Sequence, residues 1–149
     1  MRITTVCLGN ICRSPIAAAV LASELADLGV EVDSLGTAGW HIGRGADPRA
    51  VAALERAGYD LDHTARQASA QVLEDSDLVL AMDESNLEDL RSMGVDAVLI
   101  RSFDPDADDV SVEDPYYGSD ADFDTTVAVI RATVPGLRSH IEGLTRPLG

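Results

Sequence analysis

Short runs of aliphatic and β-branched residues recur along the chain, and segments with helical spacing of apolar positions separate them. The runs at 2–6, 30–36, 77–82 and 97–100 predict four strands. The spacing between them predicts helices over 14–29, 47–58, 69–76 and 83–94. An acidic loop follows over 102–120, and a helical pattern then extends to about Leu144, which Pro135 should kink or break.

Capping signals support several of these helix starts. Ser14 is expected to cap the first helix, with Pro15 at the first helical position. Asp47 and Pro48 form the same combination at the second helix, and Asp83 is a good cap for the helix that follows it. We therefore interpret Asp83 as a helix cap rather than a catalytic residue, and the same holds for Asn86.

Strands that alternate with helices predict an α/β fold with a parallel sheet covered by helices on both faces. The chain is long enough for one domain, which we expect to span residues 1–149. Right-handed crossovers favour the strand order 2-1-3-4, in which the order reverses beside strand 1. Ligands of such sheets bind at the carboxyl ends of strands near the reversal, so the loop after strand 1 is the predicted site.

Composition and charge exclude several classes of protein. Apolar residues make up 46% of the 149 residues, which is typical of a globular protein. The net charge of −15 argues against nucleic acid and anionic membranes as partners, and the chain has no lysine for a Walker A loop. Two cysteines five positions apart form neither a disulfide framework nor the usual zinc pair, and three scattered histidines make no metal site.

The first residues, MRITTVCLGN, lack the long apolar stretch typical of a signal peptide, and no apolar run approaches about 20 residues. We therefore expect a soluble, cytoplasmic protein without metal or cofactor, and leave open an export route that needs no signal peptide. The sequence carries no information on whether the chain pairs with itself, and a monomer is the default expectation.

The loop VCLGNICRSP is built like an anion cradle between a strand and a helix. Gly9 and Asn10 tolerate positive φ, so Leu8, Gly9, Asn10, Ile11 and Cys12 have room to curl with their N–H groups inward. The helix that follows points its N-terminus at the same place, and Arg13 is suited to clamp two oxygens of a bound anion.

Cys7 lies at the mouth of this cradle, where N–H groups, a helix N-terminus and an arginine all favour a thiolate. The Ser14 hydroxyl is placed to donate to the sulfur. The loop therefore predicts a phosphate site with an activated nucleophile beneath it.

CLGNICRSP resembles the C-x-x-x-x-x-R-S loop of the low-molecular-weight protein tyrosine phosphatases. The resemblance continues in matching order through WHIGRGADPRA, DHTARQ, MDESNLEDL and EDPYYGSDADF, and so covers residues 3 to about 123. It implies a phosphatase that hydrolyses phosphotyrosine in proteins, and small aryl phosphates, through a phosphocysteine on Cys7.

The resemblance also implies roles for residues outside the loop. Asp114, before Pro-Tyr-Tyr, would be the general acid and then the general base. Trp40, Tyr116 and Tyr117 would line the pocket that holds the substrate ring. His63 would bond Asn10 and Ser14 from behind the cradle, whereas His41 and His140 carry no comparable argument and are expected to be partly exposed.

Cys12 suggests redox control, because curling the loop would bring it near Cys7. Peroxide would oxidise the Cys7 thiolate, and Cys12 would trap the product as a disulfide. The same pairing occurs in the family that the chain resembles.

Three alternative functions compete with this interpretation. Bacterial arginine phosphatases share the loop but resemble C-x-G-N-T-C-R-S, with threonine where this chain has Ile11, and the bulkier Ile11 favours an aryl group. Arsenate reductases of this fold need two further cysteines that the chain lacks. A cysteine phosphocarrier or a phosphate-binding module would have no use for a general acid such as Asp114.

Overall fold

The structure, a computed structural model, describes residues 1–145, with only the main chain of Thr145. Its sheet has four parallel strands in the order β2-β1-β3-β4, which confirms the predicted topology. The strands are β1 (Arg2–Cys7), β2 (Glu31–Gly36), β3 (Leu78–Ala81) and β4 (Val98–Leu99).

The strand register places the ends of the two longest strands side by side. β1 pairs with β2 from Arg2 opposite Glu31 to Cys7 opposite Gly36, and with β3 on its other edge. The order of the strands reverses beside β1, so a loop that leaves Cys7 emerges at the ligand-binding edge of the sheet.

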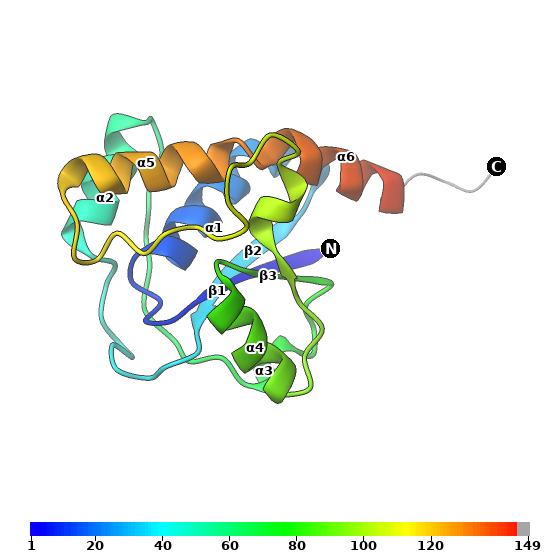
Figure 1. The fold of residues 1–149 in the computed structure, drawn as a ribbon. Helices are drawn as coiled ribbons and strands as arrows, with labels where there is room; N and C mark the ends of the chain where they lie inside the picture. Colours follow the sequence, from blue (N-terminus) through cyan, green and yellow to red (C-terminus); the bar gives the residue numbers. More distant parts are fainter. Residues whose placement is uncertain (146–149) are drawn as a thin grey trace.

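Helices cover both faces of this sheet (Figure 1). One side carries α1 (Arg13–Glu24), α2 (Pro48–Arg56), α5 (Asp120–Arg131) and α6 (Val134–Thr145). The other carries α3 (Ala70–Leu73) and α4 (Glu84–Ser92). Two 3₁₀ turns, η1 (Ala26–Leu28) and η2 (Ile100–Phe103), complete the fold.

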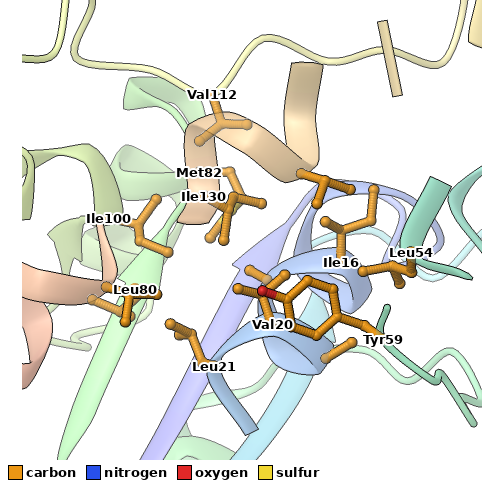
Figure 2. Packing of buried hydrophobic residues seen from close by; sticks show 14 of the residues in the cluster. Ile16, Val20, Leu21, Leu54, Tyr59, Leu80, Met82, Ile100, Val112 and Ile130 are labelled. Carbon is orange, nitrogen blue, oxygen red and sulfur yellow. The ribbon is translucent and has the colours of Figure 1, made fainter. Parts of the chain in front are cut away.

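The larger core lies between the sheet and α1, α2, α5 and α6. Figure 2 shows Ile16 and Val20 of α1 beside Leu54 of α2 and Ile130 of α5, and all four side chains are buried. A smaller core joins the opposite face of the sheet to α3 and α4. Burial of aliphatic side chains on both faces fixes β1 at the centre, and with it the start of the loop that follows.

The start of α1 differs from the prediction. The helix begins at Arg13, with Cys12 as the N-cap residue and no side-chain capping bond, so Ser14 is not the cap and Pro15 is not the first helical residue. The Ser14 hydroxyl bonds inside the loop instead of capping the helix. The predicted helix 14–29 also ends early, at Glu24, and Gly29 closes η1 with φ 69°.

Other expectations hold with shorter bounds. Asp47 caps α2 and Asp83 caps α4, as predicted. β4 is two residues long because Ile100 begins η2, and the helix predicted over 69–76 is the single turn α3. The last helical segment breaks at 132–133, which leaves Pro135 in the first turn of α6. Across residues 1–145, every helix is too short or too polar to cross a bilayer.

Candidate active site

Most carbonyl groups of the loop between β1 and α1 accept hydrogen bonds from other segments. Thr37 N donates to Cys7 O at 2.9 Å, and Ala38 N donates to Leu8 O at the same distance. The other acceptors are Asn10 O, bonded by His63 Nε2 at 2.6 Å, Ile11 O, bonded by Asp47 N at 2.9 Å, and Cys12 O, bonded by Ile16 N at 3.1 Å. Surrounding segments therefore hold the loop from outside through its acceptors.

The N–H groups of the same loop have no such partners. Within residues 1–145, the main-chain N–H groups of residues 8–14 donate to no protein acceptor. Backbone donors that find no protein partner normally face water or a ligand. A loop whose carbonyls point outward and whose N–H groups are unpaired has the form that binds an anion.

One residue makes the sharp turn in this loop. Asn10 has φ 57°, which confirms that the curl passes through the left-handed region, whereas Gly9 does not adopt a positive φ. A Cβ at Gly9 would lie 3.1 Å from His41 Cδ2, a tight contact that a small shift of the His41 side chain would relieve. Gly36, at the end of β2, has the stricter requirement, because a Cβ would lie 2.8 Å from Leu8 O and 2.9 Å from Asn10 Cβ.

The side chain of Asn10 holds its own strained backbone in place. Asn10 is fully buried, and its amide donates to Ser14 Oγ at 2.9 Å and to Ser34 Oγ at 3.1 Å. Its carbonyl oxygen accepts from Arg66 N at 2.9 Å. Both amide hydrogens and the oxygen are thus used, which offsets the cost of burying the amide and of the left-handed conformation.

Cys7 lies at the floor of this loop, and its residue is only 3% exposed. Its Sγ is 3.0 Å from Ser14 Oγ, a hydroxyl that also accepts from Asn10. The single hydroxyl proton of Ser14 has two acceptors within reach, Cys7 Sγ at 3.0 Å and Leu35 O at 3.3 Å, and the sulfur is the nearer of the two.

The guanidinium of Arg13 is buried and is held by one of its nitrogens. Nη1 donates to Asp83 Oδ2 at 2.7 Å and to Val112 O at 3.0 Å. Nη2 lies 3.6 Å from Asp114 Oδ2. Burial disfavours the charge, but the hydrogen bond to Asp83 and the charges of Cys7 and Asp114 raise the pKa of Arg13 above its ordinary value. The Nε and Nη2 edge is therefore the part of a charged fork available to an anion.

A pocket of about 210 Å³ opens above the sulfur. It is lined by Cys7, Leu8, Gly9, Ile11, Cys12, Arg13, Trp40, His41, Asp114, Tyr116 and Tyr117. The rings of Tyr116 and Tyr117 meet edge to face at 4.9 Å. Tyr117 is 97% exposed and Trp40 70% exposed, so aromatic side chains form the rim of a pocket whose floor is polar.

His63 supports the loop from behind and bonds Asn10 as predicted, but its second partner is Ser34 and not Ser14. Because the Asn10 carbonyl can only accept, His63 Nε2 carries the proton, and Nδ1 faces Ser34 Oγ at 3.4 Å. The predicted bond to Ser14 is absent among the described residues; Ser34, on β2, stands between them and bonds both His63 and Asn10. Burial lowers the pKa of His63, so the ring is neutral at pH 7.

Sequence reasoning missed several residues of this site. His41, expected to be partly exposed without a role, lines the pocket. Asp83, interpreted only as a cap, accepts from Asn86 N through Oδ1 and from Arg13 through Oδ2. Ser34 carried no signal, because a serine inside a strand pattern is usually an ordinary surface residue.

The second thiol of the loop differs from the first. Cys12 Sγ lies 4.0 Å from Asp47 Oδ2. Burial, together with the charges of Asp47 and Asp114, raises the pKa of Cys12 to about 12. Cys12 is therefore a protonated thiol at neutral pH, unsuited to be the nucleophile.

This geometry, a buried thiol under a ring of free N–H groups with an arginine fork beside it, defines a cysteine-based phosphate-loop site. The family described as low molecular weight phosphotyrosine protein phosphatase matches residues 2–146. A relative from Mycobacterium tuberculosis, low molecular weight protein-tyrosine phosphatase A, is 42% identical over 95% of this chain and 92% of its own. The chain belongs to this family.

Solved structures agree with that assignment. The protein tyrosine phosphatase from Entamoeba histolytica is 28% identical, covers 98% of this chain and 99% of its own, and superposes with a TM-score of 0.91. An arginine phosphatase from Drosophila is 30% identical, covers 94% of this chain and 97% of its own, and superposes with a TM-score of 0.87. The fold is thus shared by phosphatases that are named for different substrates.

The neutral state of His63 predicts a pH-dependent stability. Its folded pKa is lowered, so between that value and the unfolded value of about 6.5 the unfolded chain binds the extra proton. The free energy of unfolding should therefore fall as pH drops below about 6.5, by at most about 1.4 kcal/mol per pH unit from this group. Above that pH the group contributes no slope.

Urea unfolding of the parent and of His63→Gln between pH 5 and pH 8 measures this effect. The variant should be less stable at pH 7 and should show a shallower loss below about 6.5. His140→Gln is the matched control, because His140 is exposed and contacts the Phe103 ring away from the loop. If the free energy of unfolding fell equally steeply with pH below about 6.5 in the parent and in His63→Gln, the lowered pKa of His63 would be contradicted.

Proposed function

We propose that this protein hydrolyses phosphotyrosine in proteins, and small aryl phosphates, through a phosphocysteine intermediate on Cys7. The observation that carries the proposal is the convergence of Cys7, Arg13 and Asp114 on one pocket with an aromatic rim. Phosphoproteins are the proposed substrates, and neither a metal nor a cofactor is needed for the steps below.

In the first step, the phosphate of the substrate binds to the loop N–H groups and to Nε and Nη2 of Arg13. The Cys7 sulfur attacks phosphorus in line with the phenolic oxygen. The P–O bond breaks as the S–P bond forms, and Asp114 gives its proton to the departing phenolate. The N–H groups stabilise the equatorial oxygens, where charge is distributed in the transition state.

In the second step, a water molecule attacks the phosphocysteine. The Asp114 carboxylate takes a proton from that water, the S–P bond breaks, and the Cys7 thiolate is restored with Ser14 donating to it. Phosphate then leaves, and Asp114 is protonated for the next cycle.

The walls of the pocket favour an aryl group over an arginine side chain. Ile11 lies among the apolar and aromatic residues Leu8, Trp40, Tyr116 and Tyr117, which suit the face of a phenyl ring. A phosphoserine side chain is too short to reach from this rim to the loop. Arginine phosphatase activity stays the alternative, because the fold also occurs in a protein named for that activity.

Turnover of matched peptides tests this choice. We expect kcat/KM for a phosphotyrosine peptide to exceed that for the same peptide with phosphoarginine by about tenfold or more, because Ile11 and the aromatic rim suit a phenyl ring and the carboxylate of the lining, Asp114, serves as the general acid. Ile11→Thr should narrow the ratio. A preference of the parent for phosphoarginine would refute the proposed substrate class.

Redox control through Cys12 stays a prediction, and the structure adds a condition to it. The Cys7 thiolate would attack peroxide and release hydroxide, which leaves a sulfenic acid on Cys7. The Cys12 sulfur would then displace the sulfenic oxygen as water, with its own proton. Because the pKa of Cys12 is raised to about 12, formation of the disulfide should be slow at pH 7 and faster at higher pH.

Peroxide treatment followed by reduction with a thiol tests this hypothesis. The parent should recover most of its activity, whereas Cys12→Ser should recover several-fold less, since its sulfenic acid is open to further oxidation. Equal recovery of the two proteins would exclude a protective disulfide.

A further inference from the structure

The loop that carries Asp114 needs a device that fixes its position. Asp114 lies between η2 and α5 outside any helix or strand, and its side chain is 46% exposed. Local bonds shape the loop, since Tyr116 N donates to Asp114 Oδ1 at 3.1 Å and Gly118 N donates to Pro115 O at 2.8 Å. These bonds set the turn but do not attach it to the phosphate loop.

Arg13 holds the segment before Asp114 through Val112 O, and Arg49, in the first turn of α2, holds the turn after it. Arg49 Nη2 donates to Tyr116 O at 2.9 Å, and its Nη1 lies 3.3 Å from Gly118 O and donates to it. Both acceptors are main-chain carbonyls of the turn that follows Asp114. A rigid planar fork that bonds two carbonyls of one turn fixes the orientation of that turn as well as its distance.

The other edge of the same guanidinium is held by Asp47. Arg49 Nε donates to Asp47 Oδ1 at 3.1 Å and Nη2 donates to Asp47 Oδ2 at 2.9 Å. The Asp47 carboxylate is itself fixed, because its side chain is 9% exposed and caps α2 through Arg49 N. Asp47 N donates to Ile11 O, so this pair begins at the phosphate loop.

Two aromatic rings pack against the Arg49 guanidinium and restrict its orientation. Its central carbon lies 4.5 Å from the centre of the Phe123 ring and 5.6 Å from that of Tyr116. Phe123 is fully buried in the larger core, so the stack has a fixed base. Arg49 therefore links the turn after Asp114 to three fixed parts of the fold. These are the N-cap of α2, the phosphate loop that Asp47 N contacts, and the core that contains Phe123.

We infer that Arg49 is a positioning residue for the general acid. It does not line the pocket above Cys7, so it acts through the backbone of residues 116–118 and not on the substrate. The inference rests on the proposed function, in which Asp114 protonates the leaving group. Through these contacts, the Asp47–Arg49 pair fixes the position of the Asp114 carboxyl group relative to the loop that begins at Cys7.

A positioning role of this kind has a specific kinetic signature. kcat/KM reports the step that forms phosphocysteine, and only a poor leaving group needs a proton in that step. Displacement of Asp114 should therefore lower kcat/KM for phenyl phosphate and leave dinitrophenyl phosphate nearly unchanged. A general loss of fold or of phosphate binding would lower both values together.

The experiment measures kcat/KM for both substrates with the parent, Arg49→Gln, Asp114→Asn and the double variant. For phenyl phosphate we expect a loss of about 10²-fold or more for Asp114→Asn and about tenfold for Arg49→Gln. For dinitrophenyl phosphate both losses should stay within about twofold. The double variant should be no worse than Asp114→Asn alone, because Arg49 acts through Asp114.

Two further variants complete the design. Arg56→Gln is the matched control, since Arg56 lies on the same helix and pairs with Asp124 away from the pocket. It should behave like the parent. Arg49→Lys keeps the charge but not the fork, and should lose several-fold with phenyl phosphate. This milder variant keeps the test valid should Arg49→Gln unfold, which circular dichroism would show.

The outcomes separate this inference from the proposed function. Equal losses for both substrates, no loss in either Arg49 variant, or additive losses in the double variant would overturn the positioning role. If Asp114→Asn itself showed no dependence on the leaving group, the assignment of Asp114 as the acid would be wrong, whatever the Arg49 variants did.

Discussion

The N–H and C=O of a peptide unit point in opposite directions, so a loop whose carbonyls are hydrogen-bonded on its outer side presents its N–H groups to the inside. The loop between β1 and α1 depends on this constraint, and much of the surrounding structure serves it. The carbonyls of Cys7, Leu8, Asn10 and Ile11 accept from segments that are distant in sequence, and Asn10 carries the strained turn. Because acceptors hold the loop from outside, the donors inside are left for an oxyanion without any rearrangement.

Two helix-capping aspartates also hold arginines of the site. A carboxylate has two oxygens, and an N-cap uses one of them for the helix. Asp83 caps α4 and holds Arg13 with its second oxygen, and Asp47 caps α2 while it holds Arg49. One arginine completes the anion site, and the other attaches the turn that follows Asp114. Helix termini are rigid points of the fold, so they are suitable anchors for side chains that need exact placement.

The sheet order and the place of the site could be predicted from the sequence, because both follow from local periodicity and from the chirality of crossovers. The order of residue types in CLGNICRSP was equally informative, since Cys7, Asn10 and Arg13 each have a narrow chemical use there. Ser14 was misplaced as a cap because capping signals describe a helix alone, whereas its hydroxyl is used by the loop.

What could not be predicted are contacts between distant segments. The sequence predicts that His63 bonds Asn10 and Ser14; the bond to Asn10 is present, but the second partner is Ser34 from the neighbouring strand. The requirement for glycine at position 36 depends on a close approach of Leu8 and Asn10 that only the folded chain reveals. The second role of Asp83 has the same origin, because a cap signal contains no information about which side chain reaches the free oxygen.

The central claim is that the ring of N–H groups holds a phosphoryl group directly over an ionised Cys7. Rapid-quench analysis with a labelled aryl phosphate tests it most directly. The account predicts a burst of phenol equal to the enzyme concentration, with the label on Cys7, followed by its release as free phosphate at the turnover rate. Release of phosphate without labelled Cys7, or a label on Cys7 that persists without hydrolysis, would contradict it.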